Sequence, residues 1–241
     1  MTVTGRSGRM GQAVLEAIGA NAEAEVFSTH DNGENLLKAL DETEAVIDFS
    51  THSFTAELVA AAREKGCALV IGTTGHGAEE KMVIEEAAKE IPVVFAPNFS
   101  VGVNTLFYLT RKAARLLGNE QFDIEVVEMH HRHKIDAPSG TARRLLEILQ
   151  EETETPDDEI AHGRVGNIGA RPQGEIGMHT LRGGDVVGDH TVIFAADGER
   201  FELTHKASSR QTFASGAVRA ALWLRGKEPG LYSMEDVLDL R

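Results

Sequence analysis

The chain has 241 residues, 41% of them hydrophobic, so it can bury the core of one large domain or of two ordinary ones, and disorder is not expected. Its formal net charge of −14 argues against nucleic acid or an anionic membrane as the partner, because both select basic surfaces. The absence of a long apolar run or signal peptide, and a single cysteine, Cys67, that leaves no intramolecular disulfide, predict a protein of the reducing cytoplasm.

Up to about residue 100, short β-type runs alternate with helical patterns. The β-type runs cover residues 2–5, 24–30, 45–50, 68–74 and 91–98, and the helical patterns cover 10–21, 35–40, 55–66 and 78–90. Such alternation predicts an α/β, Rossmann-like doubly wound parallel sheet with helices on both faces. The first strand is short, and the crossover before residue 45 contains only one weak helix.

The pattern changes after residue 100 and predicts a second domain of the α+β type with a mixed sheet. Two helices at 104–118 and 141–152 flank a strand at 123–134, and β-type runs separated by glycines cover 174–207. Residues 150–175 have the composition of a surface loop. The tail is helical again at 209–227 and 233–240, where Ser233 and Asp236 form a capping box.

Three glycines, Gly5, Gly8 and Gly11, lie between the first strand and its helix. Glycines there permit a tight turn and bring backbone N–H groups close to a pyrophosphate at the helix N-terminus. The later strands end in small polar segments, 28–31, 48–51, 72–75 and 96–100, which a parallel sheet collects at the edge where ligands bind. The coincidence predicts a dinucleotide site, although strand-to-helix turns and strand ends commonly hold such residues without function.

The choice between NADH and NADPH stays open at this level. Asp31 lies at the expected end of the second strand, where an acid binds the hydroxyls of an adenosine ribose. Arg6 and Arg9 in the glycine loop instead suit a 2′-phosphate.

The segment "EMHHRHKIDAPSGTA" (128–142) places His130, His131, Arg132, His133 and Lys134 in a row. Zinc binding is disfavoured, because neighbouring residues of a strand point to opposite faces and the two cations repel a metal ion; we expect no metal. A solvated strand end explains a single histidine but not five such residues together. A histidine that transfers a proton and a lysine that holds negative charge explain the cluster better.

A straight strand would hold His130 and Lys134 about 13 Å apart at ~3.3 Å per residue. We therefore expect the chain to bend after His130, so that both side chains reach one pocket. The helix that follows begins at Ser139, its expected N-cap, and the backbone N–H groups of Gly140 and Thr141 would attract an anion such as a carboxylate. An ordinary capped helix with no ligand is the alternative.

Taken together, "GRSGRMG", "VIGTTG", "APNFSVGVN", "EMHHRHKIDAPSGTA", "LRGGDVVGDHTV" and "LTHKASSRQTFASGAVRAALWL" resemble the 4-hydroxy-tetrahydrodipicolinate reductase family, also called dihydrodipicolinate reductases. The resemblance spans nearly the whole chain in order. It implies a dinucleotide-binding domain (1–100), a substrate-binding and tetramerisation domain (101–209) and C-terminal helices (210–241) that return to the first domain. It also implies a homotetramer and hydride transfer from NADH or NADPH to an anionic cyclic dicarboxylate, with loss of water.

The resemblance further implies the roles of individual residues. His130 is the proton donor or acceptor, Lys134 is a proton donor or charge stabiliser, and His131 binds a substrate carboxylate with Gly140 and Thr141. The implied cofactor-binding residues, with Asp31 added from its position, are Gly5, Arg6, Ser7, Gly8, Arg9, Met10, Gly72, Thr73, Thr74, Ala96, Pro97, Asn98 and Phe99.

Two other functions fit the same motifs. One is a different Rossmann oxidoreductase acting on an anionic amino or keto acid. The other is a catalytically silent nucleotide-binding sensor, which the intact cluster of basic residues disfavours.

Overall fold

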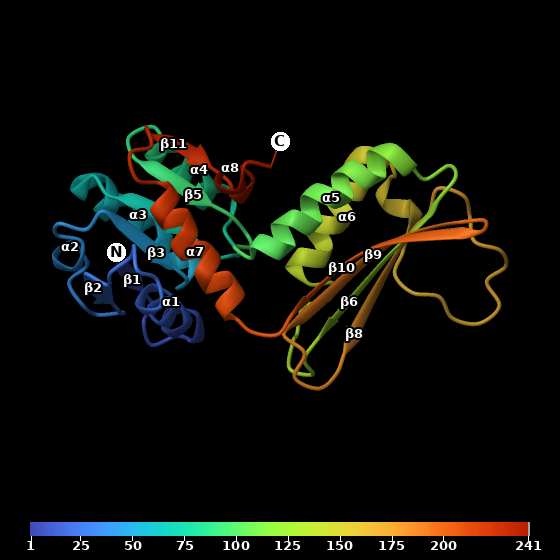
Figure 1. The fold of residues 1–241 in the computed structure, drawn as a ribbon, viewed down its shortest axis with the longest axis horizontal. Coiled ribbons are helices and arrows are strands. Elements are labelled where there is room, and N and C mark those ends of the chain that lie inside the picture. Colours follow the sequence, from blue (N-terminus) through green and yellow to red (C-terminus); the bar gives the residue numbers. More distant parts are fainter. Residues whose placement is uncertain (241) are drawn as a thin grey trace. The chain divides into compact units, whose positions relative to one another are not determined.

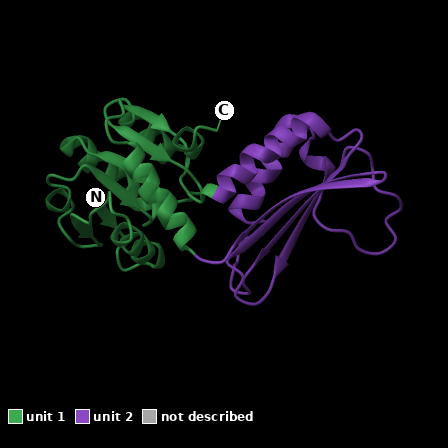
Figure 2. Ribbon diagram, in the orientation of Figure 1, with its two compact units in different colours: residues 1–101, 210–241 green, residues 102–209 purple. Residues whose placement is uncertain are grey.

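The computed structural model describes residues 1–240 and divides the chain into two compact units (Figure 1; Figure 2). Unit 1 combines Met1–Val101 with the C-terminal segment that starts at Arg210, and unit 2 is Gly102–Ser209. Within the described residues, no helix is both long enough and apolar enough to cross a membrane.

Unit 1 is built on a six-stranded, all-parallel sheet with the strand order β11-β5-β4-β3-β1-β2. Its N-terminal elements are β1 (Thr2–Thr4), α1 (Arg9–Gly19), β2 (Ser28–His30), α2 (Leu36–Ala39), β3 (Ala45–Asp48), the 3₁₀ turn η1 (His52–Phe54), α3 (Thr55–Lys65), β4 (Ala68–Ile71), α4 (Ala78–Ala87) and β5 (Pro92–Phe95). The C-terminal segment adds α7 (Gln211–Trp223), β11 (Gly230–Tyr232) and α8 (Met234–Leu238). The predicted doubly wound parallel sheet is confirmed.

Helices cover both faces of this sheet because its central strands carry apolar side chains on both sides. On one face, Val3, Ile47 and Val70 pack against α1 and α7, which also contact each other. On the opposite face, Val46 and Leu69 pack against α2, α3 and α4. Such double burial is typical of parallel sheets and explains why the strands read as continuous apolar runs.

Two elements of unit 1 differ from the prediction. The strand expected at 24–30 contains only Ser28–His30, and no strand was expected at Gly230–Tyr232. The strand at Gly230–Tyr232 is a three-residue edge strand in which Leu231 is 46% exposed, so its sequence shows no alternation of hydrophobic and polar residues. Pairing with β5 creates it, and this is a tertiary effect.

Unit 2 is built on a mixed five-stranded sheet with the order β10-β9-β6-β8-β7. Its elements are α5 (Val101–Leu117), β6 (Asp123–His130), α6 (Gly140–Thr153), the 3₁₀ turn η2 (Asp157–Glu159), β7 (Ile160–Ala161), β8 (Ile176–Arg182), β9 (Gly188–Ala196) and β10 (Glu199–Ala207). Helices α5 and α6 lie on one face of the sheet (Figure 1), where Leu145 and Leu149 pack against Ile124 and Val126. The predicted mixed sheet is confirmed.

Two boundaries in unit 2 differ from the prediction. The strand expected to continue to residue 134 ends at His130, and the segment 150–175 contains the end of α6, η2 and the short β7 as well as loop. The expected turn between β9 and β10 is present at Asp197–Gly198, with Gly198 at φ +87°.

One helix contact in unit 1 tests this packing. A Cβ added at Gly216 of α7 would lie 1.8 Å from the backbone oxygen of Phe99, whereas at Gly19 of α1 it would meet nothing within 4 Å. Gly216→Ala is therefore expected to destabilise the protein by roughly 1–3 kcal/mol, as overpacking does. Gly19→Ala, the control, is expected to be neutral or stabilising by up to about 1 kcal/mol. Urea denaturation measures both, and equal stabilities would contradict this account of the α7 contact.

Candidate active site

The glycine loop of unit 1 requires glycine for steric reasons. Gly5 follows β1 at φ +67°, and its carbonyl accepts a hydrogen bond from the N–H of Gly8 at 3.0 Å. A Cβ at Gly11 would lie 2.1 Å from the Gly5 oxygen, so the first turn of α1 packs directly on the loop. Gly8 is the N-cap of α1 and supplies no side-chain cap, which leaves the helix N-terminus suited to an anion.

Asp31, immediately after β2, lies against this loop, and its carboxylate accepts a hydrogen bond from the N–H of Ser7 at 3.2 Å. Arg6 points to the same place: its guanidinium forms a two-pronged ion pair with Glu34 at 2.6 Å and lies 3.7 Å from Asp31. The hydrogen bonds from Arg6 lower the pKa of Glu34 to about 2, so Glu34 is ionised at neutral pH. Arg6 is therefore already paired with two carboxylates.

A cavity of about 480 Å³ opens beside the glycine loop. Its lining residues are Gly5, Ser7, Gly8, His30, Asp31, Asn32, Phe49, Ser50, Thr51, Ser53, Phe54 and Glu57. Of the residues predicted to bind cofactor, Gly5, Ser7, Gly8 and Asp31 therefore share one cavity. The aromatic and hydroxyl side chains of 49–54 are not among the residues predicted to bind cofactor, although the sequence predicts a polar strand end at 48–51.

Of the other predicted cofactor residues, Arg6, Arg9 and Met10 belong to the glycine loop and the start of α1, and the remainder follow β4 and β5; none of them lines this cavity. The side chains of Thr73, Ala96 and Phe99 are buried, whereas Gly72, Thr74, Pro97 and Asn98 are at least partly exposed. A Cβ at Gly72 would lie 2.1 Å from the ring of Phe49, so glycine is needed there for packing.

Asp48 joins these strand ends and was not identified from the sequence. It is fully buried at the end of β3, and its carboxylate accepts hydrogen bonds of 2.5 Å from the hydroxyls of Thr4, Ser50 and Thr73. Because Thr4 ends β1 and Thr73 follows β4, one carboxylate fixes the glycine loop relative to its neighbouring loops.

In unit 2, the bend expected after His130 is confirmed. The N–H groups of His131 and Arg132 bind the carbonyls of Val186 and Gly184, in the loop between β8 and β9, and the N–H of Lys134 binds the carbonyl of His131 in a turn. The positive charge of Lys134 lowers the pKa of His130. Lys134 itself pairs with Asp136 at 2.8 Å.

His130 is buried at the end of β6, and its ring is held from one side. Its Nδ1 atom lies 2.6 Å from the carboxylate of Glu128, which is fully buried on the same face of β6. Burial has the largest effect on the pKa of His130 and lowers it, Glu128 opposes this, and the charges of Lys134 and Arg182 lower the pKa further. The pKa of His130 is therefore lowered, and an anion placed beside the ring would raise it.

The helix start next to His130 has the expected cap. The Ser139 hydroxyl accepts a hydrogen bond from the N–H of Ala142 at 3.2 Å and lies 3.1 Å from Nε2 of His190. Burial lowers the pKa of His190 to about 4, so this histidine is neutral at physiological pH. The α6 N-terminus, with Gly140 and Thr141 as its first residues, thus lies beside the histidines of β6 and β9.

His131 and His133 follow the end of β6, and their ring centroids are 6.1 Å apart. His133 is exposed, whereas Nδ1 of His131 is buried and has no hydrogen-bond partner among the described residues. A buried ring nitrogen without a partner is available for an external donor or acceptor.

Sequence reasoning missed Glu128, Arg182 and His190 in this cluster. The signal for Glu128 was present, because Ile124, Val126, Glu128 and His130 alternate on one strand face, and a carboxylate in such an apolar row needs partners. Nothing in the sequence placed Arg182 and His190 beside β6, since that depends on strand pairing.

Two family models match the chain: the N-terminal part of dihydrodipicolinate reductase over residues 1–99 and its C-terminal part over residues 102–238. The chain is 64% identical to 4-hydroxy-tetrahydrodipicolinate reductase of Akkermansia muciniphila over 239 residues, covering 99% of this chain and 97% of the relative. It is 50% identical to the enzyme of the same name from Pseudomonas fluorescens over 267 residues, covering 100% and 99%.

Among solved structures, the chain resembles the dipicolinate-bound dihydrodipicolinate reductase from Paenisporosarcina sp. TG-14, with a TM-score of 0.78, 23% sequence identity and 96% coverage of each chain. At that identity the likeness concerns the fold. The sequence matches carry the assignment: this chain belongs to the dihydrodipicolinate reductase family.

Proposed function

We propose that the protein reduces 4-hydroxy-tetrahydrodipicolinate to tetrahydrodipicolinate, with loss of water, using NADH or NADPH, in the diaminopimelate route to lysine. The observation that carries the proposal is the cluster at the end of β6. There the buried His130 and the N-cap Ser139 of α6 are both bound to Glu128, and Lys134 follows in the turn after the strand, in a chain of this family. An acid, a cation and an anion-binding helix start are what reduction of a cyclic dicarboxylate needs from a protein.

In this proposal the substrate carboxylates bind the positive parts of unit 2. One carboxylate accepts hydrogen bonds from the first N–H groups of α6, at Gly140 and Thr141, and from His131. The helix dipole adds to this attraction within the first turn. Ser139 supports the arrangement because its side chain caps the amide of Ala142 and leaves the helix start well ordered.

His130 and Lys134 handle protons and charge. His130 donates or accepts a proton through Nε2, because its Nδ1 is bound to Glu128. Lys134 either donates a proton or stabilises the negative charge of the substrate. Asp136 keeps the ammonium group in place at 2.8 Å until an anion arrives.

The cofactor belongs to unit 1, whose residues fit a dinucleotide. Gly11 packs so closely on Gly5 that no side chain fits there, and the cavity beside this loop is lined by Asp31 and by aromatic rings that suit an adenosine. The remaining proposed contacts come from Arg6, Arg9 and Met10 and from the ends of β4 and β5. When bound, the nicotinamide supplies the hydride.

We further propose a homotetramer. The face of the unit 2 sheet opposite α5 and α6 presents Val127, Met129, Leu181 and Ile193, which alternate with the residues of the buried face. The adjoining loop leaves Val165 93% exposed. Apolar side chains on a face without its own helices suit a second copy of the chain. A cytoplasmic location completes the proposal and agrees with the one buried free thiol, Cys67.

Activity tests the proposal directly. With enzymatically generated substrate, we expect the near-ultraviolet absorbance of NADH or NADPH to decrease. His130→Ala and Lys134→Ala should each lower kcat by about 10²- to 10⁴-fold, as loss of acid–base catalysis does, and leave the cofactor affinity unchanged. No turnover with either cofactor would refute the reaction. Full turnover by both variants would refute the assigned roles.

The pairing of Arg6 predicts a preference for NADH. A 2′-phosphate would meet Asp31 and Glu34, and the nearby cation is already bound to both. Glu34→Gln should release Arg6 and tighten NADPH binding by about tenfold, with little change for NADH. Glu57→Gln also removes one carboxylate charge, from the lining of the cavity beside the glycine loop, without releasing Arg6, so it is the matched control. Titration calorimetry measures both affinities, and equal effects of the two variants would contradict the role of Arg6.

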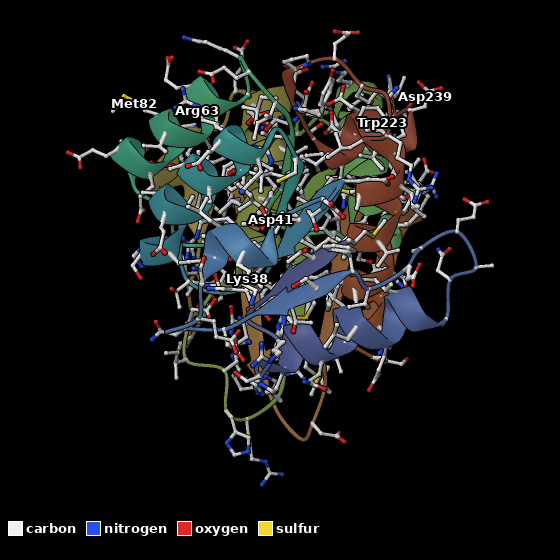
Figure 3. The ribbon with its side chains drawn as sticks, turned by 90° about the vertical axis from the view of Figure 1, so that its left-hand side faces the viewer. Lys38, Asp41, Arg63, Met82, Trp223 and Asp239 are labelled. Carbon is white, nitrogen blue, oxygen red and sulfur yellow. The ribbon has the colours of Figure 1, made fainter. Side chains whose placement is uncertain are left out.

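The tetramer has its own test. Leu181→Asp places a charge on the helix-free face and should lower the mass of the assembly in light scattering after gel filtration. Met82→Asp, on the exposed surface of α4 in unit 1 (Figure 3), is the control and should leave the mass unchanged. A wild-type protein that is monomeric at micromolar concentration would refute the tetramer.

A further inference from the structure

Glu128 is an ionised side chain of unit 2 that has no exposure to solvent. It is fully buried, and its two carboxylate oxygens have four hydrogen-bond donors. Oε2 lies 2.6 Å from Nδ1 of His130 and 2.9 Å from Nη1 of Arg182. Oε1 accepts hydrogen bonds of 3.0 Å from Nη2 of Arg182 and from the N–H of Ser139.

These partners belong to three different parts of the site. His130 is the proposed acid, Ser139 is the N-cap of the proposed carboxylate-binding helix, and Arg182 ends β8. Arg182 also donates to the carbonyl of Asp136, whose side chain pairs with Lys134. A single buried carboxylate is thus connected to His130, to the start of α6 and, through Arg182, to the loop that carries Lys134.

The bonding pattern fixes the state of the His130 ring. Burial by itself raises the pKa of Glu128, but the hydrogen bonds from Arg182, His130 and Ser139 outweigh it and the pKa is lowered, so Glu128 is an ionised acceptor. An ionised carboxylate accepts only, and Nδ1 of His130 must therefore carry a proton. The other nitrogen, Nε2, faces Gly188, where an added Cβ would lie 2.9 Å away. Glycine at this position keeps the reactive nitrogen uncovered by a side chain.

We infer that Glu128 is a positioning residue, which holds His130 in one tautomer with Nε2 available and, through Arg182 and Ser139, ties it to the Lys134 loop and to the start of α6. The expected effect of Glu128 on the rate rests on the proposed function, whereas its effect on the tautomer of His130 does not. Glu128 acts through His130 and does not itself contact substrate.

Glu128→Gln tests this role because an amide cannot satisfy the same four donors. If the NH₂ group takes the place of Oε2, it faces Nδ1 of His130 and Nη1 of Arg182. If it takes the place of Oε1, it faces Nη2 of Arg182 and the N–H of Ser139. In the first case His130 must change tautomer so that Nδ1 can accept, and this places its proton on Nε2. We expect kcat/KM to fall by about 10²- to 10⁴-fold with the cofactor affinity unchanged.

The pH profile separates positioning from general structural damage. Glu128 raises the pKa of His130, so its neutralisation should move the His130-dependent limb of the kcat/KM profile to lower pH. Glu128→Asp keeps the charge and should restore the position of this limb, even if the rate recovers only partly. Glu125→Gln is the matched control: it lies on the same strand with its own arginine and histidine partners, but on the opposite face, and should leave the limb in place.

A second measurement needs no substrate. The pKa of His130, followed by NMR of histidine-labelled protein and assigned with His130→Asn, should fall in Glu128→Gln and stay unchanged in Glu125→Gln. An unchanged His130 pKa and an unchanged limb in Glu128→Gln would overturn the inference. Absence of wild-type turnover would instead refute the proposed reaction, and the NMR result would still decide the role of Glu128.

Discussion

The cluster in unit 2 depends on one physical constraint, which is that a carboxylate buried without water must be surrounded by donors. Glu128 meets this requirement with a histidine, a forked guanidinium and a backbone N–H. Removing any one donor would leave part of the buried charge uncompensated in a medium of low dielectric constant, which costs more than the loss of a surface hydrogen bond. The arrangement of His130, α6 and the Lys134 loop therefore follows from the solvation of Glu128.

Unit 1 also contains a buried carboxylate that is surrounded by donors, but here the closest donors are hydroxyl groups. Asp48 is equally buried, and its hydroxyl donors come from the ends of neighbouring strands. At the edge of the sheet where the polar strand ends meet, the carboxylate of Asp48 thus holds the loops that surround the glycine turn. In both units a buried acid organises the edge at which we propose that a ligand binds, and it holds residues of that proposed site in place.

Much of the fold followed from the sequence because burial on two faces leaves continuous apolar runs, as in β3 and β4, and because the caps at Ser139 and Ser233 are local signals. The edge strand β11 left no such signal, since pairing with β5 creates it. The bend after His130 could be inferred from the reach of an extended chain. Glu128 and Arg182 could not be paired in advance, because their meeting depends on the register between β6 and β8. The proposed preference for NADH depends likewise on Glu34, which the short crossover carries to Arg6.

We propose that a dicarboxylate binds beside His130 and that His130 takes up a proton when it does so. This proposal can be tested by measuring proton uptake on binding. Calorimetry of dipicolinate binding in buffers of different ionisation enthalpy reports the protons taken up between about pH 6 and pH 8, where a histidine titrates and the carboxylates do not. The account predicts that the wild-type protein takes up a proton and binds more tightly as the pH falls, and that His130→Asn binds without uptake. Binding with no uptake, or equal uptake by the variant, would contradict it.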